Sequence, residues 1–116
     1  MNISQFSALT GLSPHTLRYY EKIGLLASVS RNQSGHRNYS KRDQEWVAFI
    51  TRLKETGMPL NQIMEYAKLR EQGIETADQR KDLLEQHSDN LQKRIASELD
   101  HLEALKKKID YYNQLI

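Results

Sequence analysis

Basic side chains concentrate in one stretch of this 116-residue sequence, between residues 13 and 42. The stretch has one acidic residue, Glu21, and a net charge of +5, although the whole chain carries only +2. Its Lys and Arg residues are Arg18, Lys22, Arg31, Arg37, Lys41 and Arg42. Clustered cations of this kind attract a phosphate backbone and release its counterions. The chemistry that this pattern favours is therefore the binding of a polyanion.

Other chemistries find little support in the residue types. The chain has no Cys, which removes thiolate nucleophiles, disulfides, thiol switches and thiolate metal sites. His87 and His101 lie fourteen residues apart, about 21 Å along a helix, so they cannot share a metal ion within one chain. Asp and Glu are scattered without a paired nucleophile or base. We therefore expect no enzyme activity, no metal and no cofactor.

The N-terminal residues predict two short helices separated by a tight turn. The first runs from about Ser4, its expected N-cap, to Thr10, and Gly11 ends it. Ser13 then caps a second helix that has Pro at its first position and runs to about Lys22. Three leucines are spaced to pack between the helices: Leu9, Leu12 and Leu17. This spacing is typical of a helix-turn-helix, in which the second helix is the recognition helix that contacts DNA bases.

The helical period disappears between residues 25 and 39. Asn, Gln, Ser and Gly at positions 32–35 favour the tip of a short β-hairpin, and Arg31 and Arg37 lie on its two arms. A hairpin beside a helix-turn-helix is a wing, which gives cations a second approach to a duplex. The predicted architecture is a winged helix.

Two further helices are predicted to complete the core. Ser40 and Asp43 have the spacing of a capping box at the start of one helix, which Gly57 ends. A second helix follows Pro59 and ends near Gly73. The apolar positions with helical spacing are Trp46, Phe49, Ile50 and Leu53 in the first helix, and Leu60, Ile63, Met64 and Ala67 in the second.

One long helix is predicted for the rest of the chain. A capping box at Thr76–Gln79 begins it, and no Gly or Pro follows. A heptad seam breaks only at Ser88 and Glu98, and its apolar members include Leu84, Leu91, Ile95, Leu102, Leu105, Ile109, Tyr112 and Ile116. A helix about 60 Å long cannot bury this stripe on so small a domain, so it needs a partner helix. We expect a mainly α protein with a DNA-binding domain over 1–73 and a dimerising coiled coil over 74–116.

The residues Thr16 to Leu26, Gly35 to Tyr39, and Phe49-Ile50 with Gly57 to Leu60 strongly resemble the MerR family of bacterial transcription regulators. The resemblance is close over about residues 1–70. Within the family, the sequence is similar to the branch that responds to aldehydes or electrophiles. It implies a homodimer, joined by an antiparallel coiled coil, on a pseudo-palindromic promoter with an overlong spacer. The dimer then distorts the DNA so that RNA polymerase can use the promoter, at a deformation energy of about 1–6 kcal/mol.

The resemblance also implies the residues that contact DNA. Its recognition helix and wing assign this role to Thr16, Arg18, Tyr19, Arg31, His36, Arg37 and Tyr39. We expect Arg18 to grip a base, because a guanidinium can bind guanine through two hydrogen bonds, and Arg37 to clamp a phosphate. His36 stands where the family usually has Tyr, and Arg52 where the aldehyde-responsive branch commonly has its cysteine sensor. The identity of a small-molecule effector is left open.

Several alternatives stay open from the sequence. The same winged helix would serve an architectural or excisionase-like DNA-binding protein without an effector, and the heptads alone would serve a coiled-coil adaptor. Trp46, Phe49, Met64 and Tyr66 line either a ligand pocket or, as is more usual for this spacing, the core. No apolar run is long enough to cross a membrane and the first residues lack a signal core, so we expect a cytoplasmic protein.

Overall fold

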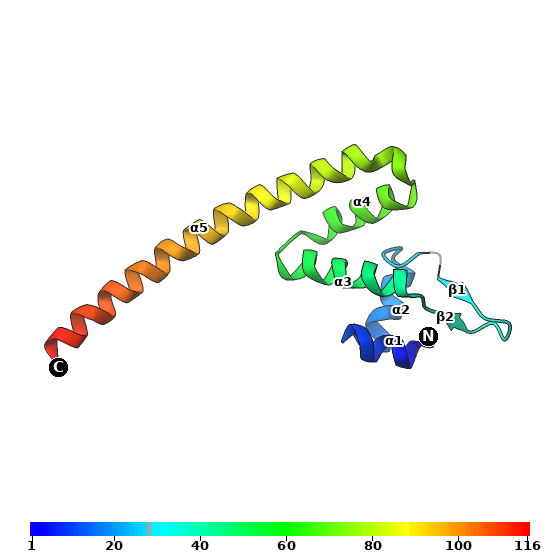
Figure 1. The fold of residues 1–116 in the computed structure, drawn as a ribbon, viewed down its shortest axis with the longest axis horizontal. Coiled ribbons are helices and arrows are strands. Elements are labelled where there is room, and N and C mark those ends of the chain that lie inside the picture. The colour runs from blue at the N-terminus through cyan, green and yellow to red at the C-terminus, as the bar shows by residue number, and fades with distance from the viewer. Residues whose placement is uncertain (28) are drawn as a thin grey trace. The chain divides into compact units, whose positions relative to one another are not determined.

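Helices make up most of the structure, with one short hairpin between the second and third helix (Figure 1). The structure is a computed structural model that describes residues 1–27 and 29–116, so Ser28 of the predicted hairpin segment lies outside the described residues. The predicted fold class is confirmed. In chain order the elements are α1 (Ile3–Thr10), α2 (Pro14–Lys22), β1 (Ser30–Arg31), β2 (Arg37–Asn38), α3 (Lys41–Glu55), α4 (Leu60–Glu71), the 3-10 turn η1 (Ile74–Thr76) and α5 (Ala77–Leu115).

The chain divides into two compact units, Met1–Lys81 and Asp82–Ile116. The first holds all the elements up to η1 and the first residues of α5, and the second is the rest of that helix. The sequence analysis placed the domain boundary between residues 73 and 74, where one helix ends and the next begins. That boundary stays a prediction. Among the described residues, no helix combines the length and the apolar composition of a membrane span.

The two N-terminal helices begin at capped residues. Asn2, and not the predicted Ser4, caps α1: its side-chain oxygen accepts the N–H of Gln5 at 2.8 Å, and the Gln5 side chain accepts the N–H of Asn2 at 3.0 Å. This reciprocal pair satisfies two free donors at once, which Ser4 inside the first turn could not do. Gly11 ends α1 with φ 73°, and Ser13 caps α2 ahead of Pro14, both as predicted.

The core of the first unit forms where α1, α2 and α3 meet. Phe6 and Leu17 are fully buried, as the helix-turn-helix pattern predicts. Leu9 is not between the helices as expected: it is 55% exposed and lines an open depression of about 230 Å³ with Arg52. It follows Phe6 by three positions, at the edge of the buried face of α1. The other core side chains include Tyr20, Leu25, Leu26, Tyr39, Trp46, Val47, Ile50, Leu53, Met58, Ile63 and Ala67.

Trp46 ties α3 to its neighbours. Its indole N–H donates to the backbone oxygen of Leu25 at 2.7 Å, and its ring stacks on Tyr66 of α4 with centroids 5.9 Å apart. The guanidinium of Arg70 covers the ring at 4.2 Å. A buried indole with its donor satisfied and its face covered is a packed core residue. Trp46 is therefore part of the core. Phe49, Met64 and Tyr66 are partly buried, and Met64 also lines an open depression, so the pocket alternative stays open for these three.

The start of α3 confirms the predicted capping box, and α5 begins directly after Thr76 as predicted, but the hydrogen bonds of Thr76 differ from a capping box. Ser40 and Asp43 satisfy each other's backbone N–H at 3.1 and 2.9 Å. Thr76, expected to cap α5 in the same way, is 5% exposed and donates its hydroxyl to the carbonyls of Leu69 and Gly73. Leu69 lies in the last turn of α4 and Gly73 in the turn after it, so the buried hydroxyl ties the start of α5 back to the end of α4.

Candidate nucleic-acid interface

The second helix presents one polar face and buries the other. Ser13 accepts the N–H of Thr16 at 3.1 Å, which fixes where the helix begins. Leu17 and Tyr20 are buried against the core, and the predicted burial of Tyr20 is confirmed. Arg18 is exposed, and Tyr19 is 48% exposed. The face that carries these two side chains is therefore available to a partner.

The wing is a two-stranded antiparallel hairpin with a tightly bonded tip. Arg31 pairs with Arg37 across the strands. The side-chain oxygen of Asn32 accepts the N–H groups of Ser34 and His36, each at 3.0 Å. Gly35 has φ 83°, a left-handed conformation that favours glycine. The Arg31 guanidinium donates to the Gly35 carbonyl at 2.8 Å, so this cation is held along the wing.

Helix α2 and the wing share one open groove of about 680 Å³. Its lining includes three guanidinium groups, those of Arg18, Arg31 and Arg37, together with the side chain of His36. The N-terminal end of α1 supplies polar walls, Asn2 and Gln5 among them. None of the described lining residues is acidic. A concave, cationic surface with fixed amide donors matches the negative charge and the hydrogen-bond acceptors of a phosphate backbone.

Four of the predicted contact residues line the groove and the other three do not. Arg18, Arg31, His36 and Arg37 line the groove, whereas Thr16 and Tyr19 lie on α2 outside that lining. Tyr39 corrects the prediction: it is 2% exposed and stacks on Phe6 with ring centroids 4.3 Å apart. Because its ring is buried between α1 and the wing, it supports the interface and has no free face to offer to DNA.

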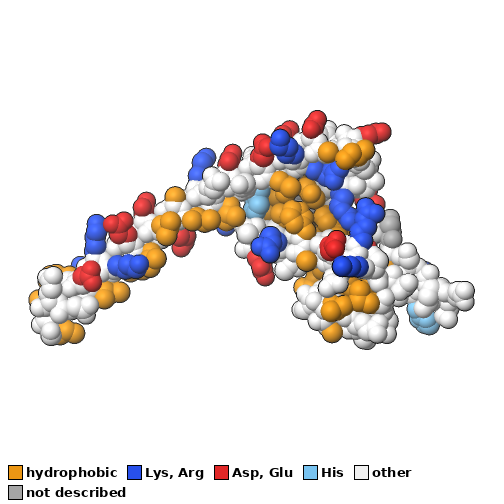
Figure 2. Space-filling model, viewed as in Figure 1, with side chains coloured by type: hydrophobic (Ala, Val, Ile, Leu, Met, Phe, Trp, Pro, Cys, Tyr) orange, Lys and Arg blue, Asp and Glu red, His pale blue; other side chains and the backbone are white. Residues whose placement is uncertain are grey.

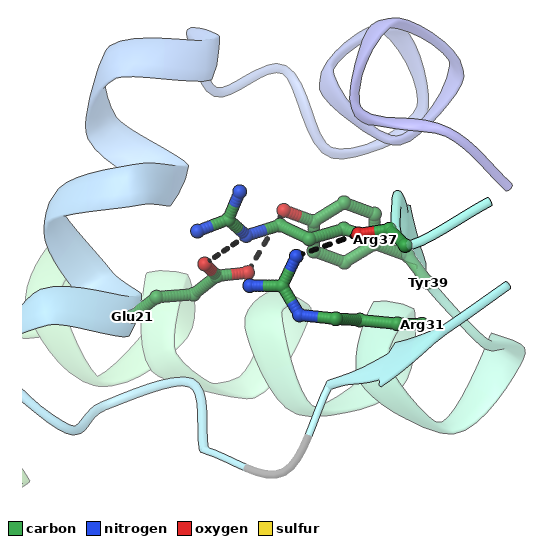
Figure 3. Close-up of polar contacts among 5 residues, drawn as sticks. Glu21, Arg31, Arg37 and Tyr39 are labelled. Carbon is green, nitrogen blue, oxygen red and sulfur yellow. Dashed lines mark hydrogen bonds and ion pairs between the residues drawn. The ribbon is translucent and has the colours of Figure 1, made fainter.

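Glu21 is the residue that the sequence analysis missed (Figure 3). One carboxylate oxygen accepts the Nε–H of Arg37, and the other accepts the hydroxyl of Tyr39 at 2.9 Å. The Glu21 side chain is only 14% exposed and the Arg37 side chain is 37% exposed. The available signal was its position as the single acidic residue in the basic stretch. Charge counting alone could not say which cation it meets.

The pKa of Tyr39 reflects this arrangement. Burial raises it most, and the hydrogen bond to Glu21 and the negative charge of that carboxylate raise it further, to about 12 from 10.0. The positive charges of Arg37 and Arg18 act in the opposite direction. Tyr39 therefore stays neutral and keeps donating to the carboxylate throughout the physiological range.

The second unit presents an apolar stripe along α5, which has no buried residue (Figure 2). Leu84 and Leu91 are partly buried, and Ile116, just beyond the end of α5, is 98% exposed. The other predicted seam residues are about half exposed: Ile95, Leu102, Leu105, Ile109 and Tyr112. Leu99, which is 59% exposed, lies next to the seam position occupied by Glu98 and was missed by a strict heptad. Lys107 pairs with Glu103 at 3.7 Å, with both side chains largely exposed, as expected of a solvated face.

The described residues include no cluster of side chains that could bind a metal ion: no group of three or more His, Asp or Glu side chains is placed to hold one. Arg52, which stands at the expected sensor position, is an exposed residue in the depression beside Leu9. A winged helix with a cationic groove, followed by a long helix with an apolar stripe, defines the class of winged-helix DNA-binding proteins.

Comparison with known proteins makes the class specific. The family described as "MerR HTH family regulatory protein" matches residues 1–70, and "MerR, DNA binding" matches residues 44–111. The chain is 35% identical to an HTH-type transcriptional regulator of Haemophilus influenzae over 104 residues, which are 90% of this chain and 77% of that protein.

Two solved structures are similar over nearly the whole chain. A MerR family regulator from Listeria monocytogenes has a TM-score of 0.91 at 34% identity, covering 97% of this chain and 86% of that one. HiNmlR, a MerR family regulator lacking the sensor domain and bound to promoter DNA, has a TM-score of 0.86 at 32% identity, covering 97% and 90%. The chain belongs to the MerR family, and it is a DNA-binding transcriptional regulator and not an enzyme.

Proposed function

We propose that this regulator binds a pseudo-palindromic promoter as a homodimer and switches transcription by distorting the DNA between two polymerase recognition elements. The observation that carries the proposal is the cationic groove shared by α2 and the wing, which brings the guanidinium groups of Arg18, Arg31 and Arg37 together. Arg18 reads a base edge in the major groove, and Arg37 binds a phosphate. Double-stranded DNA is the ligand that uses both kinds of contact.

The apolar stripe of α5 supports the dimer. The helix has 39 residues and is therefore about 58 Å long. Exposed leucine and isoleucine side chains along such a length are stabilised by a second helix that covers them. A second copy of the chain buries the apolar stripe with its own α5. The dimer then has two winged-helix units, one for each half-site of the operator. The symmetry of the dimer then requires an inverted repeat in the operator.

The switch follows from the energetics of DNA deformation. The free and effector-bound dimers differ in how strongly they favour a bent and untwisted promoter, which requires about 1–6 kcal/mol of differential free energy. Bending and untwisting the overlong spacer brings the two recognition elements into the relative orientation that RNA polymerase requires. The polymerase then binds both elements. The identity of a small-molecule effector stays open, and the 116 residues contain no Cys through which a thiol-based effector would act.

Selection of binding sites from random duplexes tests the reader. The purified protein is incubated with the pool at about 0.15 M salt, which suppresses non-specific phosphate binding. We expect enrichment of an inverted repeat with two equivalent half-sites. Folded protein that enriches no sequence would indicate an architectural binder if its affinity falls steeply with salt, and a coiled-coil adaptor if it does not.

A transcription experiment then tests the switch. The selected operator is placed in promoters whose spacers differ by single base pairs, and transcription is measured in vitro with purified polymerase and cell extract as the effector source. We expect activation only with the longer spacers, accompanied by a change in fluorescence transfer between labelled duplex ends. Activation that does not depend on spacer length would contradict the distortion mechanism.

A further inference from the structure

The wing is too small to hold its own position. Its strands have two residues each, and an isolated two-stranded hairpin is marginally stable in water. Its internal bonds at Asn32 fix the tip and leave its orientation toward α2 undetermined. A phosphate contact made from the wing therefore depends on whatever fastens the hairpin to the rest of the first unit.

Two sets of contacts fasten the wing. The N-terminal amino group donates to Asn38 Oδ1 at 2.9 Å and to the Tyr39 carbonyl at 2.8 Å, which holds the end of the wing to the N-terminus. Glu21, in the last turn of the recognition helix, joins the wing to α2. Its two carboxylate oxygens take separate partners, the Nε of Arg37 in β2 and the hydroxyl of Tyr39 just beyond it (Figure 3). Tyr39 in turn stacks on Phe6 of α1 with the planes 5° apart. One carboxylate thus joins the recognition helix to the wing, and the stack of Tyr39 on Phe6 joins the wing to α1.

The geometry also leaves Arg37 able to bind DNA. The contact with Glu21 uses Nε, and a guanidinium has further N–H donors on its two terminal nitrogens. The Arg37 side chain is 37% exposed and lines the cationic groove, whereas Glu21 is 14% exposed and is absent from the described lining. The carboxylate therefore holds one edge of the guanidinium from behind, and the groove side stays open.

From this arrangement we infer that Glu21 is a positioning residue for DNA binding: it strengthens binding by locking the wing and Arg37 against the recognition helix. A simple charge argument predicts the opposite, because an acidic residue beside a phosphate-binding cation should weaken binding to DNA. The inference concerns DNA affinity alone, so it does not depend on the proposed dimer or on promoter distortion.

Two variants of Glu21 separate these explanations. Glu21→Asp keeps the charge and withdraws the carboxylate by one methylene, so a charge effect predicts unchanged affinity. Glu21→Gln removes the charge, so a charge effect predicts tighter binding. If Glu21 positions the wing, both variants bind a duplex about tenfold more weakly, because a charged hydrogen bond has been lost or lengthened. Their affinity also falls less steeply with salt, as one phosphate contact becomes weaker.

A double-mutant cycle with Arg37→Ala identifies the partner. Without Arg37 only the bond to Tyr39 remains for Glu21→Gln to weaken, so the loss of affinity should be clearly smaller than in the presence of Arg37. Glu45→Gln is the matched control, since Glu45 is an exposed residue of α3 and loses the same charge. We expect this control to cause no loss of affinity in either background.

Hydrogen exchange of the wing amides in the free proteins completes the test and does not require DNA. The amides of residues 30–38 should exchange faster in both Glu21 variants, while those of α3 keep wild-type protection. Tighter binding by Glu21→Gln, unchanged affinity of Glu21→Asp, or an equal Glu21→Gln effect with and without Arg37 would each overturn the inference. A general loss of protection in α3 would also overturn it, by showing that Glu21 supports the fold and not the wing.

Discussion

The free energy of unfolding should fall at alkaline pH, because the folded protein favours the neutral form of Tyr39. Burial, followed by the hydrogen bond and the charge of Glu21, raises its pKa from 10.0 to about 12 in the folded protein. A raised pKa means that folding favours the protonated hydroxyl. Its contribution is fully present below pH 10 and is lost as the pH rises through about 12.

The size of the effect follows from the shift. Each pKa unit corresponds to about 1.4 kcal/mol, so the two-unit rise gives up to about 3 kcal/mol between the two limits. Tyr39→Phe keeps the ring that stacks on Phe6 and removes the titrating hydroxyl. We therefore expect the free energy of unfolding of the wild type to fall relative to that of Tyr39→Phe between pH 10 and about 12, by up to about 1.4 kcal/mol per pH unit.

Two measurements check this prediction. Denaturant unfolding of both proteins at several pH values gives the difference in unfolding free energy, in which the titration of the other groups largely cancels. The tyrosinate absorbance of the folded wild type should show one of its six tyrosines titrating near pH 12, and Tyr39→Phe should lack that step. Parallel stability curves for the two proteins, or an unchanged absorbance titration in the variant, would refute the reasoning.

The remaining predictions concern the reader, the core and the dimer. Arg18→Ala should lose discrimination among operator sequences, by about 1–3 kcal/mol at one base pair, whereas Arg37→Ala should weaken binding to every duplex alike. Equal losses on all sequences from both variants, measured by fluorescence anisotropy, would contradict this division. Trp46→Phe should lower the unfolding free energy by about 1–3 kcal/mol, because the Leu25 carbonyl loses its indole donor; a thermal melt that matches the wild type would speak against this. Leu102→Glu combined with Ile109→Glu should dissociate the dimer by placing like charges on the seam, and a dimer that persists in sedimentation would show that the seam is wrongly assigned.

Much of the local structure was predictable because its causes are local. Ser13 and Pro14 specify where the recognition helix begins, and Ser40 with Asp43 does the same for α3. Gly35 permits the left-handed turn at the tip of the wing. Caps and turns of this kind depend on a few neighbouring residues, so the sequence shows them directly.

Competition between nearby residues explains the local errors. Asn2 and Ser4 can both cap a helix, and the choice between them depends on which partner completes the reciprocal pair. The Thr76 hydroxyl donates backward to the carbonyls of Leu69 and Gly73, while its oxygen accepts from Arg80 of α5, and a sequence pattern does not show these partners. In both cases the sequence identified the right kind of residue near the right place.

The sequence by itself determined the family, the order of the elements, the cations of the winged-helix unit and the apolar stripe of α5. Only the tertiary structure decided which polar residues meet: it buried Tyr39 against Phe6 and placed Glu21 between Arg37 and Tyr39. The physical reason is distance along the chain. Helical period, caps and charge density are properties of neighbouring residues, whereas Glu21 and Tyr39 are eighteen positions apart and come together only when the wing folds back on the recognition helix.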